Sequence, residues 1–506
     1  MFKSVITAAT ALTLLASAIH AQPARFRSPL ELTSSDTSLT AAFQWAKTQA
    51  SAFAFEGDAV GPWFEAALPG REAFCMRDVA HQVTGAHALG MQQHVRNMLG
   101  RFAAAISERR DWASLWEIDR HGQPAHADYR NDGDFWYNLP ANFDVVDASW
   151  RMYLWSGNRD YLTDSTFLHF YQRSVTDYVQ RWQLDAATVM SRPRIMNARA
   201  TPDPDAQFTG NRGIPGYNED GDDFTVGLDL LAAQYAGFAA YARITEARGE
   251  LADARRWLAK AGEVRALVNG RWWDASTRTF YDHLSTNGRL THRAPSAWNS
   301  AALYWPVSDE GPRVQGALQA LRTQVRASPP APIEEQSHHP EVLYRYGAAD
   351  EAYRELLSLS AATRARREYP EVSFSVIGAI VTGLMGVSVD PVTPGREATL
   401  LRYFENPAVT TLAQLPPSAT SVELAHVPIR ANDVTLRHDA AQASMLTNNA
   451  GPALIWQPAF AGRHPTLLVN GAPVKPAMMT MPGGREVSTT RVVVAPGTTV
   501  RVSIAR

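Results

Sequence analysis

The stretch PGREAFCMRDVAHQ, residues 69–82, runs directly into VTGAHALGMQQHVRNMLGRFAAAI, residues 83–106. The second stretch has apolar and small residues at helical spacing, whereas the first holds two carboxylates, two arginines and a histidine. Burying a charged side chain where a helix enters an apolar interior costs free energy unless the charge is paired, so unpaired charges there indicate a functional role. The pattern therefore indicates either an ion-paired helix entrance or one wall of an active site.

Helical periodicity of the same kind extends from about residue 37 to residue 387, in segments separated alternately by short and long loops. In successive pairs, one segment is charged and the next is rich in apolar and small residues, as an outer and an inner layer require. The predicted outer and inner helices are, pair by pair, residues 37–54 and 79–91, 92–107 and 140–156, 159–183 and 224–247, 250–269 and 297–305, 309–326 and 339–347, and 349–360 and 373–387. Six such hairpins predict a mainly α fold, an (α/α)6 barrel of two concentric rings.

The long loops share one position, because each of them precedes an inner helix. They span residues 55–78, 108–139, 184–223, 270–296, 327–338 and 361–372. In a closed barrel these loops gather at one end, around the N-termini of the inner helices. The sequence therefore predicts that side chains far apart in the chain meet in one pocket.

Beyond about residue 395 the helical pattern changes to short β-rich runs such as SVELAHVPI. Alternating apolar residues and turn pairs such as Asn470-Gly471 indicate an all-β sandwich. We therefore expect a barrel domain over residues 22–392 and a small C-terminal β-sandwich domain over residues 393–506.

Residues 1–21 have the form of a secretory signal peptide, because Lys3 precedes an apolar run that is too short to span a bilayer and ends in small residues. We therefore expect export to the periplasm or the extracellular space. The 48 basic and 50 acidic residues nearly balance and form no long run, which argues against nucleic-acid and membrane partners. Cys75 is the only cysteine, and a small buried thiol is its expected role.

Acidic residues stand immediately before two of the inner helices. In RGIPGYNED, a stiff turn containing two glycines and a proline delivers Glu219 and Asp220. In REYPEVSF, Glu368 and Glu371 precede the last inner helix. Two carboxyls that face each other across a pocket, one protonated and one ionised, are what hydrolysis of a glycosidic bond requires.

The same loops carry aromatic and basic side chains, which are the usual complement of sugar rings and their hydroxyl groups. The side chains expected to bind substrate are Arg71, Arg77, Asp78, His81, Asp134, Trp136, Tyr217, Asp220, Trp298, His338 and His339. The alternatives are that Arg71 with Glu72 and Arg77 with Asp78 form structural salt bridges, and that His81 is a buried core histidine. No HExxH pattern or cysteine accompanies the histidine pair at 338 and 339, so neither a metal nor another cofactor is expected.

The six helical hairpins, the acids before the inner helices and the trailing β region resemble the six-hairpin, (α/α)6-barrel glycosidases. The nearest group is the bacterial α-L-rhamnosidases, whose loop after the first barrel helix carries an acidic, arginine-containing motif ending in Gly-Asp-Ala. PGREAFCMRDVAHQ occupies that place, although FCMRDV lacks the family's Trp and Gly. This resemblance implies that Glu72 and Asp78 are pocket acids, and that Glu368 or Glu371 matches the glutamate before the last helix.

Other glucosidase families with a similar barrel place an acid in the loop before the third inner helix and a base in the loop before the sixth. By that resemblance the acid is Glu219 and the base is Glu371 or Glu368. We therefore expect Glu219 to act as the general acid, with Glu72 as its rival.

These expectations describe an exported, exo-acting glycoside hydrolase that inverts configuration and removes a terminal sugar from a plant or microbial oligosaccharide or glycan. Two other functions fit the same residues. A polysaccharide lyase on a similar helical toroid would take its base from Tyr217, His338 or His339. A non-catalytic glycan-binding protein would use the acids only to accept hydrogen bonds from hydroxyl groups.

Overall fold

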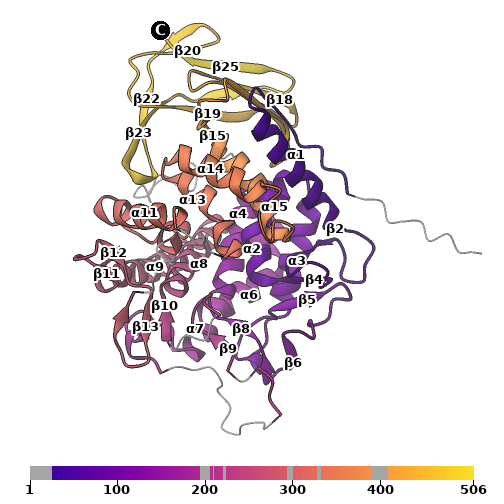
Figure 1. Cartoon of the computed structure of the whole chain (residues 1–506), viewed down its shortest axis with the longest axis vertical. Coiled ribbons are helices and arrows are strands. Elements are labelled where there is room, and N and C mark those ends of the chain that lie inside the picture. The colour runs from indigo at the N-terminus through magenta and orange to yellow at the C-terminus, as the bar shows by residue number, and fades with distance from the viewer. Residues whose placement is uncertain are drawn as a thin grey trace, which may run out of the picture.

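The computed structural model describes residues 26–193, 205–208, 210–219, 224–292, 300–327, 332–389 and 408–505. The expected signal peptide, the expected domain boundary and two candidate residues, Asp220 and Trp298, lie outside these ranges. In Figure 1 the helices form the larger part of the molecule, and the C-terminal strands, in yellow, cover one end of it.

The helices fall into an outer set, buried on one side, and an inner set, buried over most of its surface. The outer helices in the described ranges are α1 (Thr37–Ala52), α3 (Gln92–Ala104), α5 (Asp160–Thr163), α6 (Ser165–Val175), α7 (Asp177–Arg181), α9 (Leu251–Arg271), α11 (Pro312–Val325) and α14 (Ala349–Ser360). The inner helices in these ranges are α2 (Met76–Ala88), α4 (Ala141–Ser156), α8 (Leu228–Ala247), α10 (Ala301–Tyr304), α13 (His339–Arg345) and α15 (Pro370–Gly378), which continues as the π-helical η4 (Ala379–Leu384). The short elements η1 (Glu108–Arg110), η2 (Val189–Ser191) and α12 (Ile333–Gln336) lie in the connections. Each predicted helical segment overlaps an observed helix.

The inner helices pack side by side around a ring. Helix α2 packs against α4 and α15, α4 against α8, α8 against α10, and α13 against η4. Between α10 and α13, Arg345 Nη1 donates to the carbonyl oxygen of Tyr304 at 2.6 Å, and Tyr346 Oη donates to that of Leu303 at 3.2 Å. Helices α2 and α15 approach closely because Gly85 has no side chain; a Cβ there would lie 2.1 Å from Phe374 O.

The C-terminal region is rich in sheet, as predicted. One sheet has the order β1 (Glu31–Ser34), β16 (Ser421–Ile429), β17 (Asn432–Asp439), β18 (Ala443–Ala450), β25 (Thr499–Ile504), β20 (Leu467–Val469) and β21 (Ala472–Val474). The other has the order β15 (Val409–Leu412), β19 (Leu454–Ala461), β23 (Arg485–Thr489) and β22 (Ala477–Met481), with β24 (Val492–Val494) also pairing β19 and η6 (Pro482–Gly484) between β22 and β23. Strand β1 was not predicted: it pairs antiparallel with β16, so the N-terminal part of the described chain completes a C-terminal sheet.

Short strand pairs connect the loops that precede the inner helices. Strand β4 (Ala73–Cys75) pairs with β5 (Glu117–Asp119), β8 (Tyr137–Asn138) with β9 (Arg212–Ile214), and β10 (Phe224–Gly227) with β13 (His283–Ser285), which also pairs with β14 (Leu290–Thr291). Other pairs are β2 (Ala54–Phe55) with β3 (Trp63–Phe64), β6 (Tyr129–Asn131) with β7 (Asp134–Phe135), and β11 (Trp273–Asp274) with β12 (Thr279–Phe280). Because the β4–β5, β8–β9 and β10–β13 pairs each join two long loops, these loops converge at one end of the ring, which we call the loop end.

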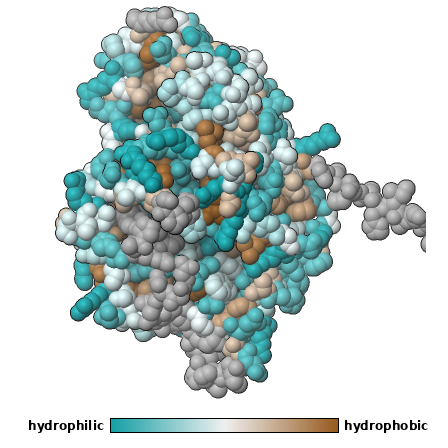
Figure 2. Space-filling view, viewed as in Figure 1, coloured by the Kyte–Doolittle hydropathy of each residue, from teal (hydrophilic) through white to brown (hydrophobic). Residues whose placement is uncertain are grey.

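The surface is mostly polar. On the face shown in Figure 2, teal and white residues predominate and brown ones are scattered. The exposed large apolar side chains in the described ranges are Leu68, Leu251, Leu258, Met478 and Val493. None of the helices in the described part of the chain has both the length and the hydropathy of a membrane span.

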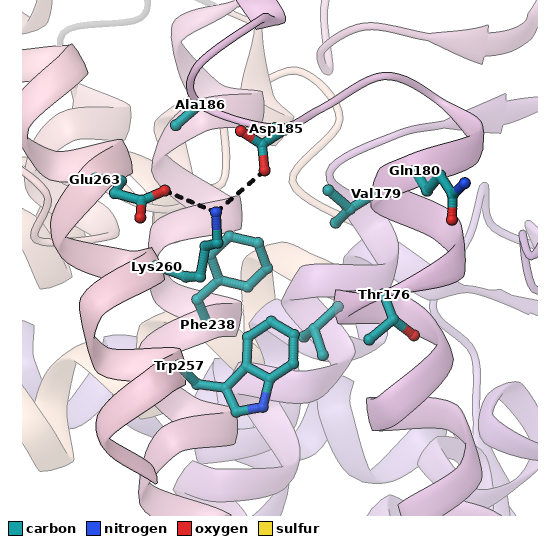
Figure 3. A pocket seen from close by; sticks show the side chains of 10 residues that line it. Thr176, Val179, Gln180, Asp185, Ala186, Phe238, Trp257, Lys260 and Glu263 are labelled. Atoms are coloured by element: carbon teal, nitrogen blue, oxygen red, sulfur yellow. Dashed lines mark hydrogen bonds and ion pairs between the residues drawn. The ribbon is translucent and has the colours of Figure 1, made fainter. Parts of the chain in front are cut away.

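The described part of the molecule has a smaller and a larger cavity. A surface cavity of about 380 Å³ lies between α7 and α9, where Lys260 bridges Asp185 and Glu263 at 3.2 and 2.9 Å (Figure 3). A cavity of about 940 Å³ lies between the C-terminal halves of α4 and α8 and the strands β15 and β22. Its wall includes the ion pair of Arg151 with Asp147, whose Nε and Oδ2 atoms lie 2.9 Å apart. Lys260 in the first wall and Arg151 in the second are therefore paired within the protein.

Candidate active site

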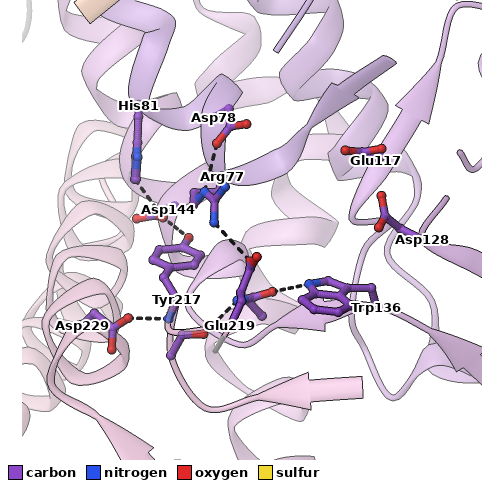
Figure 4. A network of polar contacts seen from close by, with 12 residues as sticks. Arg77, Asp78, His81, Glu117, Asp128, Trp136, Asp144, Tyr217, Glu219 and Asp229 are labelled. Carbon is purple, nitrogen blue, oxygen red and sulfur yellow. Dashed lines mark hydrogen bonds and ion pairs between the residues drawn. The ribbon is translucent and has the colours of Figure 1, made fainter. Parts of the chain in front are cut away.

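The first turn of α2 carries an arginine and an aspartate that connect two distant parts of the chain. Arg77 Nε lies 2.9 Å from Asp78 Oδ1, and Arg77 Nη1 lies 3.2 Å from Glu219 Oε1 (Figure 4). The guanidinium carbon is 5.6 Å from the ring centre of Trp116 and 5.5 Å from that of Tyr217, within the range of cation–π attraction. Arg77 thus ties the start of α2 to the loop that precedes α8.

Glu219 is more accessible than its neighbour Asp78: 36% of its side chain is exposed, against 11%. Besides Arg77, it accepts a hydrogen bond of 3.2 Å from Asn138 Nδ2. Burial raises the pKa of the Glu219 carboxyl above its ordinary value; the positive charge of Arg77 opposes the rise and the negative charge of Asp78 adds to it. An accessible carboxyl with a raised pKa has the properties of a proton donor.

Glu371 lies in the first turn of α15 and is 6% exposed. Burial raises the pKa of its carboxyl well above the ordinary value, and the negative charge of Asp78 raises it further. The pKa of Asp78 is itself raised by burial, although Arg77 opposes that rise. Two acids that interact in a buried site do not both ionise easily, so a proton on one favours ionisation of the other. In the described part of the chain, Glu371 Oε2 has no hydrogen-bond partner.

A second acidic cluster adjoins the first. Strand β5 pairs with β4 in a register that places Glu117 opposite Cys75, next to the start of α2. Arg71 Nη1 lies 2.6 Å from Glu117 Oε1 and 3.4 Å from Asp128 Oδ2. Burial raises the pKa of Glu117 to about 9, and the Asp128 carboxyl adds to the rise. Glu117 therefore holds its proton more tightly than an ordinary glutamate does, although the positive charge of Arg71 opposes the rise.

A buried aspartate connects three segments near these acids. Asp144, in the first turn of α4, is 2% exposed and accepts hydrogen bonds from the Tyr217 hydroxyl and, at 2.8 Å, from Trp305 Nε1. His81 Nε2 lies 3.3 Å from Asp144 Oδ2, and His81 Nδ1 lies 3.0 Å from His338 Nε2. Burial raises the pKa of Asp144 to about 7 and lowers the pKa of both histidines well below its ordinary value. This part of the site therefore holds neutral imidazoles at neutral pH.

A second buried aspartate holds the backbone of the loop that carries Glu219. Asp229, in the first turn of α8, accepts a hydrogen bond from the backbone N–H of Tyr217 (Figure 4). One residue earlier, the carbonyl oxygen of Gly216 accepts a hydrogen bond of 2.9 Å from Asn138 Nδ2. The loop is thus fixed at two successive residues just before Glu219.

Aromatic rings border the acids. Trp136 is partly exposed, and its Nε1 donates to Asn138 Oδ1 at 2.8 Å, which places the indole beside the amide that contacts Glu219. Tyr217 is stacked on Trp305, with ring centres 6.2 Å apart. A partly exposed ring next to carboxyls is the combination that sugars require, because their faces are apolar and their edges carry hydroxyl groups.

Most of the side chains predicted for the site are found together. The connected group contains Arg71, Arg77, Asp78, His81, Trp136, Tyr217, Glu219, His338 and Glu371. Arg77 forms the expected salt bridge with Asp78 and also pairs with Glu219. Arg71 pairs with Glu117 and Asp128, whereas its expected partner Glu72 pairs with Arg120.

Two of the predicted catalytic acids lie outside this group. Glu72 adopts a positive φ of 53°, its side chain is 61% exposed, and it pairs with Arg120 Nη1 at 2.6 Å. The next three residues, Ala73–Cys75 of β4, are buried, whereas the side chain of Glu72 lies at the surface against Arg120 and not with the acids around Arg77. Glu368 is exposed, whereas Glu371, three residues later, is buried at the start of α15. The structure therefore separates the two glutamates that the sequence left as alternatives.

Two other predicted residues, Asp134 and His339, have contacts or burial that indicate a structural role. Asp134 accepts hydrogen bonds of 2.7 Å from the backbone N–H groups of Gln207 and Phe208, and so anchors a loop. His339 is fully buried, and burial lowers its pKa to about 3.

In the described ranges, no three His, Cys, Asp or Glu side chains are grouped as metal ligands. Cys75 is buried, and burial raises the pKa of its thiol well above the ordinary value, so it is not a thiolate.

Some residues of the site were not predicted from the sequence. They are Glu117, Asp128, Asn138, Asp144, Asp229 and Trp305. For the two aspartates at 144 and 229 a signal existed: like Asp78 and Glu371, each lies in the first turn of an inner helix. Glu117 and Asp128 carried no such signal, because their environment depends on how one long loop folds against another.

No family model matches the chain, and no curated protein matches its sequence. Several solved structures have a similar fold. The α-L-rhamnosidase from Dictyoglumus thermophilum shares 11% sequence identity at a TM-score of 0.59, and the alignment covers 95% of this chain and 51% of that protein. For the α-L-rhamnosidase from Aspergillus terreus the identity is 11%, the TM-score 0.54 and the coverage 93% and 51%. For the GH78 family rhamnosidase of Bacillus sp. GL1 these values are 12%, 0.52, 83% and 40%.

This chain therefore spans about half the length of these proteins or less. At such low identity the likeness concerns the fold alone. The helix ring and its sheet-rich C-terminal region share their fold with these rhamnosidases, the group that the sequence pattern resembles.

Proposed function

We propose that this chain is an exported glycoside hydrolase that removes a terminal sugar from a glycan with inversion of configuration, on a barrel of six helical hairpins. One observation carries the proposal: Glu219 and Glu371, which precede or begin two different inner helices, both interact with the Arg77–Asp78 pair. Cleavage of a glycosidic bond needs two such carboxyls, one that donates a proton and one that accepts a proton from water.

In this proposal Glu219 is the general acid. Its carboxyl is accessible and its pKa is raised, so it remains protonated at a pH where an ordinary glutamate is ionised. Asn138 and Arg77 hold the carboxyl at one oxygen, Oε1. The other oxygen is then available to give its proton to the leaving group.

Glu371 is the general base, acting together with Asp78. Burial and the negative charge of Asp78 raise the pKa of Glu371, and burial also raises the pKa of Asp78, so the pair holds one proton. Glu371 acts as the base in the state in which that proton lies on Asp78. Arg77 pairs with Asp78, and Glu371 Oε2 is unpartnered among the described residues, so it can hold the attacking water. The activity should therefore fall at low pH, as the shared site gains a second proton, and at high pH, as Glu219 loses its proton.

A lyase fits this site less well. Tyr217, a candidate base, donates its hydroxyl proton to Asp144, and burial raises its pKa well above the ordinary value. His338 and His81 contact each other and are buried. The acids also outnumber the two arginines, whereas a lyase needs positive charge to neutralise a uronate carboxylate.

The first experiment is a screen of the purified protein against nitrophenyl glycosides and plant glycans. Nitrophenyl α-L-rhamnoside comes first, because the similar structures include rhamnosidases. A new reducing end supports the proposal, and the anomer that appears first in the NMR spectrum of the product distinguishes inversion from retention. Release of an unsaturated, ultraviolet-absorbing product would identify a lyase, and binding of glycans without turnover would identify a glycan-binding protein.

The glutamates before α15 supply a matched pair of variants. Glu371→Gln should reduce kcat by at least about 100-fold, since general-base catalysis contributes roughly 100- to 10,000-fold. Glu368→Gln changes an exposed acid three residues away and should leave kcat within about 2-fold of the wild type. Equal losses in both variants, or none in either, would refute the role given to Glu371.

A further inference from the structure

Tyr217 lies where several contacts of the site converge. It is two residues before Glu219 in the chain and only 8% exposed. Its backbone N–H donates to Asp229 and its hydroxyl donates to Asp144 (Figure 4). Backbone and side chain of one residue are thus held by carboxylates from the first turns of two inner helices, α8 and α4.

Asp144 serves more than this one bond. Its other oxygen accepts the Trp305 indole N–H at 2.8 Å, and His81 Nε2 lies 3.3 Å from the oxygen that accepts the Tyr217 hydroxyl. His81 in turn contacts His338, whose Nε2 lies 3.0 Å from His81 Nδ1. The carboxyl therefore joins α4 to the loop before α8 and to the end of α10, and it lies beside the neutral imidazole of His81 in α2.

We propose that Asp144 is a positioning residue of the reaction, which acts through the Tyr217 hydroxyl to hold Glu219 in the orientation that places its carboxyl against Arg77. The inference rests on the proposed function, in which Glu219 is the general acid. Asp144 is 2% exposed and so acts on the substrate only through the residues that it holds.

The physical requirement is one of distance. A general acid must lie within hydrogen-bond reach of the oxygen that it protonates, and a misplacement of about 1 Å can cost up to roughly 100-fold in rate. The backbone of the loop before α8 is held at Gly216 and Tyr217, and the hydroxyl bond to Asp144 adds an anchor for the tyrosine ring. Without the hydroxyl, the Asp229 bond would still hold the backbone, but the tyrosine ring would no longer be anchored at its far end.

The dependence of the rate on the leaving group reports proton donation specifically. A dinitrophenolate leaves without protonation, whereas an alkoxide does not, so a defect in the acid slows only the glycosides with poor leaving groups. The probes are dinitrophenyl, nitrophenyl and methyl glycosides of the sugar that the screen identifies. The variant is Tyr217→Phe, which removes the hydroxyl and keeps the ring.

We expect Tyr217→Phe to lower kcat by about 10- to 100-fold on the methyl glycoside and by less than about 3-fold on the dinitrophenyl glycoside. Glu219→Gln should show the same pattern with a larger loss. Asp144→Asn, a second route to the same defect, should follow Tyr217→Phe, provided that circular dichroism and the melting temperature show a folded protein.

Tyr353 offers a matched control. Like Tyr217 it is 8% exposed, and its hydroxyl donates to a buried aspartate, Asp36 Oδ2, at 2.7 Å. That bond joins α14 to the N-terminus of α1, away from the acids. Tyr353→Phe should cost similar stability and show no dependence on the leaving group.

Three results would overturn the inference. A loss in Tyr217→Phe that is equal on all three glycosides would assign the hydroxyl a purely structural role, and no loss would show that the acid does not need it. The third result is a leaving-group effect in Tyr353→Phe, which would mean that general destabilisation causes the leaving-group effect in Tyr217→Phe as well. If Glu219→Gln itself shows no leaving-group effect, or the wild type cleaves no glycoside, the proposed function fails, and the inference falls with it.

Discussion

At the scale of single residues, the balance of charge at the loop end depends on Arg77. Arg77→Gln would leave Asp78 buried without its cation, so we expect the free energy of unfolding to fall by about 3 kcal/mol, the lower end for a broken buried pair because both side chains keep some exposure. Arg256, paired with Asp253 on the surface, is the control: Arg256→Gln should cost about 0 to 1 kcal/mol. Urea unfolding of the two variants measures both values, and equal costs would contradict the importance of Arg77.

A second prediction at this scale concerns pH. Burial raises the pKa of Asp144 to about 7, above the unfolded value of about 4. The folded chain therefore binds this proton more tightly than the unfolded chain does, so the contribution of Asp144 to stability is present below about pH 4 and is lost as the pH rises through about 7. Asp144→Asn should reduce the fall in unfolding free energy between about pH 4 and pH 8. Burial also raises the pKa of Asp229 to about 7, so the variant should keep part of the dependence of the unfolding free energy on pH. Parallel curves for wild type and variant would disprove the assignment.

At the scale of elements, the contact between α2 and α15 sets the distance between Asp78 and Glu371. A Cβ on Gly85 would lie 2.1 Å from Phe374 O in the backbone of α15, so Gly85→Ala must push the helices apart. We expect a loss of stability of about 1 to 3 kcal/mol and a lower kcat, since Glu371 moves with α15.

Gly262, in the exposed helix α9, is the matched control for that substitution. A Cβ there would meet nothing within 4 Å, so Gly262→Ala should raise stability by about 0.5 to 1 kcal/mol through higher helix propensity. Thermal denaturation and kcat of both variants test the pair. A neutral Gly85→Ala would show that the two inner helices are not in close contact.

At the scale of the whole molecule, the helices and the sheets meet across two buried histidines. His87 Nε2 lies 3.1 Å from Pro428 O, and His438 Nε2 lies 3.0 Å from Met385 O. Burial lowers the pKa of both imidazoles to about 4, below the unfolded value of about 6.5. Their contribution to stability is therefore present above about pH 6.5 and is lost as the pH falls toward 4.

The double variant His87→Gln, His438→Gln keeps an amide donor near each Nε2 position and removes the titration. We expect the wild type to lose more stability than this variant between about pH 7 and pH 4.5, which unfolding by urea at each pH would show. If the wild type and the double variant lose the same stability at low pH, groups other than His87 and His438 cause the loss.

The helices could be predicted from the sequence with good accuracy because amphipathic spacing is a local property. The segment predicted at residues 349–360 coincides with α14, whereas that predicted to begin at 224 starts at Leu228 as α8. Residues 224–227 form β10, which pairs with β13 far along the chain, and local spacing carries no information about that pairing. Strand β1 was missed for the same reason, since its partner β16 lies in the C-terminal sheet.

The amino-acid pattern alone specified the order of helices, the position of the long loops and the presence of an acid before or within the first turn of an inner helix. The partners of each acid came from the fold: Glu219 pairs with Arg77, the charges of Arg77 and Asp78 act on Glu371, Glu72 pairs with Arg120, and Glu117 pairs with Arg71. Periodicity acts between neighbours in the chain, whereas a pKa depends on burial and on charges that the folded backbone brings near.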